Sequence, residues 1–190
     1  GNPELNPEIA KHYELALTQE LPFKTVFNGS IYRIDAEDVI EKDAAPTVDD
    51  PKREIYKNFE KYIFKGFEIG LENMFFDSFW MRASYNYMES EDKSEDSGRD
   101  ELQYRPRDTF SLEAKYTTQF KTSLYTSLRY VANQYNYTDK DPIQKMRMDD
   151  FVVVDLKLSQ PFLDDALNVY AGVNNLFDED YEESYGFPRP

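Results

Sequence analysis

The stretch LNVYAGVNNLFDEDYEESYGFPRP, residues 167–190, opens with a strict alternation of side chains. Leu167, Val169, Ala171 and Val173 fall on one face of an extended chain, because successive side chains of a strand point to opposite faces. The polar and small residues between them fall on the other face. This period of two predicts a β-strand with one apolar face, and it raises the question of what covers that face.

The same period recurs along most of the chain, and no segment shows the period of about 3.6 that marks an amphipathic helix. The composition agrees, because 14 Phe and 15 Tyr against only 7 Gly favour strands. Further strands are predicted at Lys11–Thr18, Phe23–Ile34 with a bulge near Val26 and Phe27, Ile63–Leu71, Phe79–Tyr87, Thr109–Tyr116, Lys121–Ala132 and Val152–Ser159. The chain of 190 residues is therefore expected to be an all-β protein.

The connections between these expected strands alternate between short and long. The short ones are residues 19–22, 72–78, 117–120 and 160–166. The long ones are residues 35–62, 88–107, 133–150 and the residues after Phe177. An antiparallel meander with this rule has all tight turns at one rim and all long loops at the other. Outer-membrane barrels follow the rule, whereas the Greek-key connections of soluble sandwiches mix the two lengths.

Three further features favour a membrane barrel. The strands expected in this chain run to about 9–12 residues, which is the length of a tilted membrane span. Tyr and Phe gather near the strand ends, as in interfacial girdles. The polar face carries charged residues such as Glu113 with Lys115 and Asp155 with Lys157, which a wet lumen tolerates. The sequence thus predicts an antiparallel up-and-down transmembrane β-barrel whose apolar rows meet outer-membrane lipid. Two alternatives stay open: a soluble extracellular β-sandwich acting as a binding module, and a complete small eight-stranded outer-membrane barrel.

Several function classes are disfavoured. The net charge of −15 argues against nucleic-acid binding. No cysteine is present for a disulfide or a cysteine zinc site, and no apolar run is long enough for a transmembrane helix. His12, the only histidine, stands beside Glu14 in an expected strand, and no Ser-His-Asp set or phosphate-binding glycine loop is recognisable. The sequence predicts no enzyme, no catalytic residue and no cofactor.

Four segments resemble the barrel of TonB-dependent outer-membrane receptors. They are GNPELNPEIAKHYELAL at residues 1–17, FKGFEIGLE at 64–72, YRPRDTFSLEAKY at 104–116 and VYAGVNNLFDEDYEESYGFPRP at 169–190. The most specific part is Asn-Asn-Leu-Phe-Asp at 174–178, followed by Tyr181 and a turn at Gly186–Pro188. The ending is most similar to the cobalamin and catecholate-siderophore branch of that family.

The resemblance implies parts of a receptor that lie outside residues 1–190. In that family one last strand follows the turn, and a plug domain and a TonB-contacting box precede the barrel. Residues 1–190 are thus expected to be the C-terminal part of the barrel, without the plug or the final strand. Eight strands would leave little room for so many long polar side chains. They are expected to form an open arc of a barrel of about 22 strands, with no pairing between the first and last.

The family also implies the function and the partners. Such receptors actively import a ferric siderophore, cobalamin or haem across the outer membrane of a Gram-negative bacterium. The ligand binds between the outer loops and the plug, and TonB acts through the plug. A monomer is expected.

Site candidates lie in the long loops. Tyr135, Tyr137 and Asp139 are expected as ligand contacts, because aromatic loops form binding platforms. A second group, with carboxylates suited to calcium, is Asp35, Glu37 and Asp38, although no complete calcium-loop motif surrounds it. The acidic run at residues 88–101 predicts a solvated loop.

Overall fold

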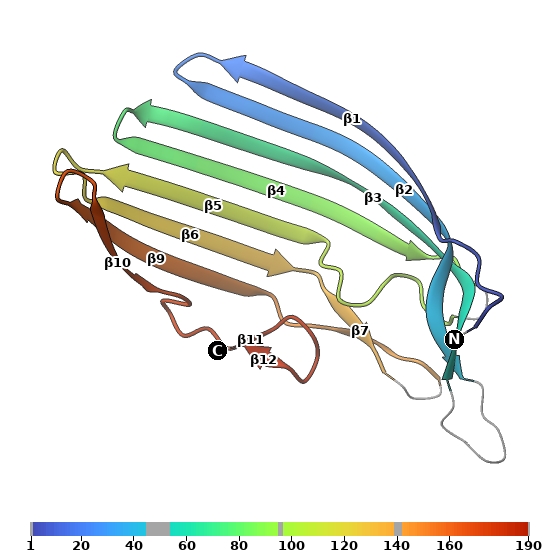
Figure 1. Ribbon diagram of the computed structural model, residues 1–190. Helices are drawn as coiled ribbons and strands as arrows, with labels where there is room; N and C mark the ends of the chain where they lie inside the picture. Colours follow the sequence, from blue (N-terminus) through green and yellow to red (C-terminus); the bar gives the residue numbers. More distant parts are fainter. Residues whose placement is uncertain (1, 45–53, 95–96, 139–141, 190) are drawn as a thin grey trace.

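The computed structural model describes residues 2–44, 54–94, 97–138 and 142–189. Within these ranges the chain forms one antiparallel sheet of eight strands in the order β1-β2-β3-β4-β5-β6-β9-β10, with two small two-stranded sheets, β7-β8 and β11-β12. The bounds are β1 Ile9–Leu21, β2 Thr25–Ala44, β3 Glu54–Phe76, β4 Phe79–Asp92, β5 Asp108–Thr117, β6 Ser123–Ala132, β7 Tyr135–Tyr137, β8 Lys145–Arg147, β9 Phe151–Phe162, β10 Leu167–Val173, β11 Tyr181–Glu182 and β12 Pro188–Arg189. Figure 1 shows the large sheet as a curved wall. No helix in the described ranges is long and apolar enough to cross a bilayer.

The two ends of the sheet do not meet. β1 pairs only with β2 and β10 only with β9 in the described residues, so β1 and β10 are opposite edges of an open arc. The predicted arc is confirmed, and a closed eight-stranded barrel is not formed. Each edge presents unpaired backbone groups along its free side, which further strands of a larger barrel would pair.

Short turns and long loops lie at opposite rims. The turns β1-β2, β3-β4, β5-β6 and β9-β10 all lie at one end of the strands, at the left of Figure 1. The long connections leave from the other end, where β7, β11 and β12 also lie. The alternation predicted from the sequence is confirmed.

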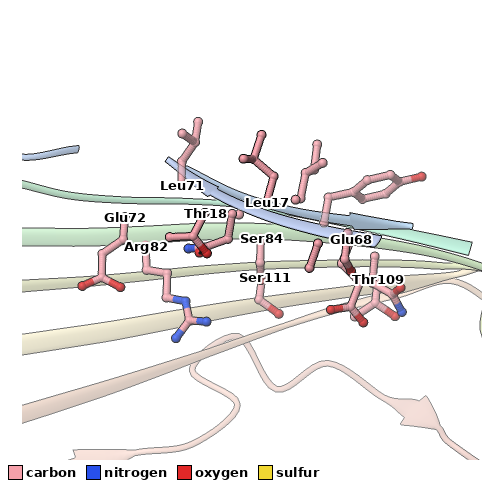
Figure 2. Close-up of a pocket in the computed structure, with 17 residues that line it drawn as sticks. Leu17, Thr18, Glu68, Leu71, Glu72, Arg82, Ser84, Thr109 and Ser111 are labelled. Atoms are coloured by element: carbon pink, nitrogen blue, oxygen red, sulfur yellow. The ribbon is translucent and has the colours of Figure 1, made fainter. Parts of the chain in front are cut away.

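The register places the apolar and polar rows on opposite faces. Val154 pairs with Leu128 and Leu128 with Leu112, whereas the neighbouring Asp155 pairs with Ser127. Directly paired residues share a face, so the period of two holds across strands as well as along them. In Figure 2, Leu17 and Leu71 point to one side of the sheet and Arg82 and Ser111 to the other. The outward face carries the predicted residues Leu156, Val154, Val173, Ala171, Ile69 and Phe67, and the inward face carries Asp155, Lys157, Glu113, Arg129 and Glu68.

The outward apolar row is exposed in the isolated chain. Leu15 is 71% and Ile31 59% exposed, and Leu158 and Val169 at the far end of the sheet are 49% and 50% exposed. Contiguous apolar area on this scale is rare on soluble monomers and marks contact with a membrane or another apolar surface. The outward face therefore has the character of a lipid-facing surface.

Two details of the sequence-based prediction are wrong. No bulge lies at Val26 and Phe27, which pair in regular register with both neighbouring strands; the irregularity lies between Ala36 and Ile40. Of the predicted loop at residues 35–62, residues 35–44 instead extend β2 and residues 54–62 extend β3, and the two extensions pair as far as Ala44 and Glu54. The sequence there has no apolar alternation, and the backbone pairing that forms the extension carries no composition signal.

We expect the two faces to differ sharply in their tolerance of charge. Leu156→Arg places a cation on the outward face and should destabilise the assembled full-length protein by about 2–4 kcal/mol. Ser127→Arg lies on the inward face beside Asp155 and should assemble like the unmodified protein. Each variant is folded into lipid vesicles, which measures its assembly. Its stability is then measured from the urea concentration at which heat-modifiable migration is lost. Equal stability of the two variants would contradict the assignment of the faces.

Candidate functional site

At the long-loop rim, the connection from β4 to β5 packs against the β7-β8 hairpin. Tyr135 pairs with Arg147 and Tyr137 with Lys145 within the hairpin. The backbone N–H of Tyr104, in the β4-β5 connection, donates a hydrogen bond to the carbonyl of Tyr135 at 2.8 Å. Two loops that are separate in the sequence thus form one unit.

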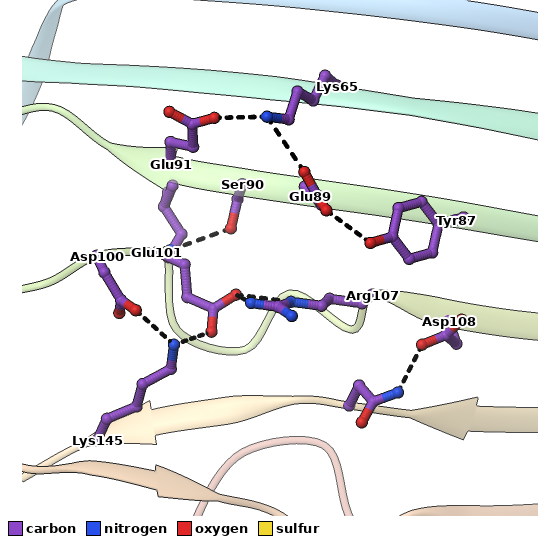
Figure 3. A network of polar contacts seen from close by, with 12 residues as sticks. Lys65, Tyr87, Glu89, Ser90, Glu91, Asp100, Glu101, Arg107, Asp108 and Lys145 are labelled. Carbon is purple, nitrogen blue, oxygen red and sulfur yellow. Dashed lines mark hydrogen bonds and ion pairs between the residues drawn. The ribbon is translucent and has the colours of Figure 1, made fainter.

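A buried carboxylate holds this unit together. The Glu101 side chain is only 4% exposed, and it accepts a hydrogen bond from Arg107 Nε at 3.1 Å. Lys145 Nζ forms one ion pair with Glu101 and a second with Asp100 at 2.8 Å (Figure 3). Burying a carboxylate is costly unless it is paired, and here two cations, one from each loop, supply the pairing. These four residues, with Tyr135 and Tyr137, form the loop latch.

The structure brings two of the predicted ligand contacts into the latch. The hydroxyl of Tyr137 donates to Asp100 and accepts from the Glu101 N–H at 3.2 Å. The Tyr135 ring lies 5.5 Å from the Arg107 guanidinium carbon and 4.5 Å from Lys145 Nζ, within cation–π range. Both tyrosines are half-buried between the loops, which fixes their orientation. Asp139, the third predicted contact, lies outside the described residues.

The expectation of a solvated acidic loop at residues 88–101 is wrong at both ends of this segment. Met88 to Asp92 continue β4, and Glu101 is buried. Glu89 and Glu91 are paired with Lys65 at 3.2 and 2.7 Å. The run of like charge concealed this order, because all of its neutralising cations except Lys93 come from outside the run.

The latch changes the ionisation of Asp100. Partial burial raises the pKa of this carboxyl, but hydrogen bonds from Lys145 and Tyr137 outweigh it and bring the pKa to about 2. Burial lowers the pKa of Lys145, but hydrogen bonds to Asp100 and Glu101 outweigh this effect. The pKa of Lys145 is therefore raised above its ordinary value. At neutral pH both groups are therefore charged, and the latch is closed.

Two of the three predicted calcium ligands, Asp35 and Glu37, are already paired with cations. Arg33 lies 2.9 Å from Asp35, and Glu37 lies 4.0 Å from Lys11 and 3.2 Å from Lys61. Asp38 lies at the irregularity in β2, with a positive φ of 57°. No cluster of three or more metal-ligating side chains occurs within the described ranges. Calcium binding by these residues stays a prediction.

A second arrangement, missed by the sequence reasoning, lies on the inward face. The segment after β10 folds back over β6 and β9, and the Tyr181 ring packs 4.5 Å from that of Phe151. Arg129 lies over both rings and bonds Glu183 at 2.9 Å. Beside this contact is a recess of about 490 Å³ lined by polar residues that include Glu113, Tyr125, Ser127, Asp155 and Asn175. A second hollow of about 410 Å³ lies further along the sheet (Figure 2).

Because its carboxylate is buried, Glu101 should be the residue on which the latch depends most. Glu101→Gln keeps the size of the side chain but removes the charge that pairs with Lys145 and Arg107. We expect a loss of local stability of about 1–3 kcal/mol. Amide hydrogen exchange at Tyr104 and Tyr135–Tyr137 should then accelerate about 5- to 150-fold in the full-length protein. Asp165→Asn, at an exposed turn of the other rim, is the control and should leave these rates unchanged. Equal effects would contradict a central role for Glu101.

The latch should also resist acid until Asp100 protonates. The pKa of Asp100 in the folded chain, about 2, lies below the ordinary value of about 3.9. Its stabilisation is therefore complete above about pH 4 and is lost as the pH falls through about 2. Peptic cleavage at Leu102 and Tyr104 should accelerate over that interval, relative to an Asp100→Asn variant that has no carboxyl to protonate. A constant ratio between the two proteins would exclude this role of Asp100.

Comparisons with known proteins agree with this geometry. Residues 1–176 match the family model described as TonB dependent receptor-like, beta-barrel. The chain is 30% identical over 186 residues to the vitamin B12 transporter BtuB of Vibrio vulnificus, covering 97% of this chain and 28% of that protein. It is 28% identical to BtuB of Photobacterium profundum, of which it covers 29%. The chain thus spans less than a third of the length of these relatives.

Solved structures show the same fold at lower identity. The ferripyoverdine receptor of the Pseudomonas aeruginosa outer membrane superposes with a TM-score of 0.71 and 22% identity, over 96% of this chain and 25% of that one. The FrpB iron transporter of Neisseria meningitidis superposes with a TM-score of 0.74 and 17% identity, over 97% of this chain and 30% of that one. The family model matches most of the chain, and the open antiparallel arc agrees with it. This chain therefore belongs to the TonB-dependent receptor β-barrel family.

Proposed function

We propose that this chain is part of the barrel of an outer-membrane receptor that imports a scarce ligand by TonB-energised transport in a Gram-negative bacterium. The ligand is a ferric siderophore, cobalamin or haem. The observation that carries this proposal is the two-faced arc, apolar outside and polar inside, with its long loops joined at one rim. It is the architecture expected of a wall between lipid and a wide wet passage.

Within that receptor, residues 1–190 form the C-terminal part of the barrel, and the plug domain and final strand belong to the rest of the protein. TonB acts through the plug, so no TonB contact is assigned to these residues. The receptor works as a monomer, and the family resemblance gives this chain no catalytic role.

Cobalamin is the first ligand to test. The relatives matched by sequence over 97% of this chain carry the name vitamin B12 transporter. The structural neighbours named for iron and ferripyoverdine are 17–22% identical and support the fold alone. The loop latch offers Tyr135 and Tyr137 as a fixed aromatic platform for such a ligand, with Asp139 beside them in the sequence.

Uptake by the full-length receptor tests this function. The gene is expressed in a Gram-negative strain that lacks its own cobalamin and catecholate receptors, with and without TonB. We expect accumulation of labelled cyanocobalamin or of a labelled ferric catecholate, and its loss without TonB. Uptake that is equal in the two backgrounds would refute energised import. If neither compound accumulates, labelled haem is the third ligand, and failure of all three would refute the proposed ligand class.

A further inference from the structure

The inward face carries one row in which aromatic rings and ammonium groups alternate. Trp80 on β4 pairs with Lys115 on β5, and Lys115 pairs in turn with Tyr125 on β6. Tyr125 pairs with Lys157 on β9, and since directly paired residues share a face, all four side chains lie at one level. Lys157 also reaches β10, where its Nζ lies 4.8 Å from the centre of the Tyr170 ring. These five residues form the lumen row.

The two lysines of the lumen row have no carboxylate partner. Among the residues that the structure describes, no ion pair joins Lys115 or Lys157 to an acid, and both residues are exposed. Elsewhere in the chain, Lys24, Lys65 and Lys121 each lie 2.6–2.8 Å from a carboxylate oxygen. The ammonium groups of the row are therefore available to an anion from outside the sheet.

The rings of the row are held in position and stay accessible. Trp80 Nε1 donates a hydrogen bond to Glu72 on the neighbouring strand at 2.9 Å, which fixes the indole. Tyr170 is 68% exposed although it stands against the Lys157 ammonium. Tyr125 also lines the polar recess of about 490 Å³ on the inward face, so the row borders a hollow. An exposed ring beside an unpaired cation offers stacking and charge at the same place.

The acids of the inward face lie on one side of the row only. Toward the long-loop rim, the next level carries three carboxylates with one cation, which are Glu72, Glu113, Asp155 and Arg82. Toward the short-turn rim, the next level on β5, β6 and β9 is neutral and consists of Thr117, Ser123 and Ser159. An anion that has passed the acids therefore has its most favourable position on this wall at the row, where two cations face it.

We propose that the lumen row is a second ligand site, which binds an anionic, ring-bearing iron complex on its way from the loops to the short-turn rim. Lys115 and Lys157 lie two strands apart, at about 10 Å, with Tyr125 between them. At this spacing the ammonium groups contact anionic oxygens on two sides of one complex, while Tyr125 stacks on a ring of it.

The inference rests on the proposed function and narrows its ligand. Ferric catecholates and haem share the required chemistry, because both are anionic iron complexes with aromatic rings. Cyanocobalamin carries no net charge and lacks the feature that the two lysines recognise. The relatives matched by sequence are named for vitamin B12, so the choice of ligand is itself a test of the row.

The test measures uptake by the full-length receptor in a Gram-negative strain that lacks its own receptors for all three ligands. Initial rates are recorded with labelled ferric catecholate, haem and cyanocobalamin, and binding to cells without TonB reports the outer site alone. Lys115→Gln with Lys157→Gln should lower the maximal uptake rate of an anionic complex about 10-fold, because the anion loses both cations beside the acids. Its affinity for cells without TonB should stay unchanged. The complex whose uptake falls, the catecholate or haem, is the one that occupies the row.

The matched control removes two lysines at the short-turn rim that are paired with exposed acids. Lys24 pairs with Asp77, and Lys121 pairs with Asp165. Lys24→Gln with Lys121→Gln should import like the unmodified receptor. Lys115→Arg with Lys157→Arg keeps both cations and should retain most of the rate. Equal losses in the two Gln double variants would overturn the proposal.

Three further outcomes separate this inference from the proposed function. If the unmodified receptor imports cyanocobalamin but neither anionic complex, the proposed function stands and the lumen row is not a ligand site. If it imports none of the three, the proposed function fails and the inference fails with it. If Lys115→Gln with Lys157→Gln slows all ligands alike and lowers the urea concentration at which heat-modifiable migration is lost, the lysines hold another part of the receptor, and the ligand assignment is wrong.

Discussion

Backbone amides and carbonyls that face hydrocarbon have no partner except one another, so a strand in lipid must be paired along both sides. The ladder from β1 to β10 meets this requirement for its inner strands, and each strand is paired with its neighbours in antiparallel register. Once the ladder is fixed, the period of two decides the side of every residue. The outward apolar row, the inward polar row and the opposite rims all follow from this one constraint.

Toward the long-loop rim, the strands continue beyond the apolar band of the outward face. At that rim, side-chain contacts hold the loops together. Glu101, Lys145 and Arg107 join the loops that follow β4 and β6, and Arg129 and Glu183 join the inward face to the segment after β10. In both places an ion pair is flanked by an aromatic ring. Each ring adds a cation–π contact to the cation of the pair.

The sequence predicts the strands best where one face meets an apolar phase. Leu167 to Val173 alternates strictly, Val152 to Leu158 alternates except at Val153, and the faces of both strands are as predicted. The β2-β3 extension shows no apolar alternation, so its residues carry no strand signal although they pair in the fold. At the candidate site, the two tyrosines were found from the aromatic loop composition. Glu101 and Lys145 were not, because 44 positions separate them and only the fold brings them together.

The position of the latch has a consequence for how a ligand would act on the barrel. Lys145 binds two consecutive carboxylates of the other loop, and Tyr137 binds the same Asp100. A displacement of the β7-β8 hairpin therefore cannot occur without moving Asp100 and Glu101 or breaking both ion pairs. Since Glu101 is buried, breaking them leaves its carboxylate with Arg107 but without the Lys145 cation, which is the costlier path. A ligand that contacts either tyrosine thus acts on both loops together, and two loops that would bind independently become one surface.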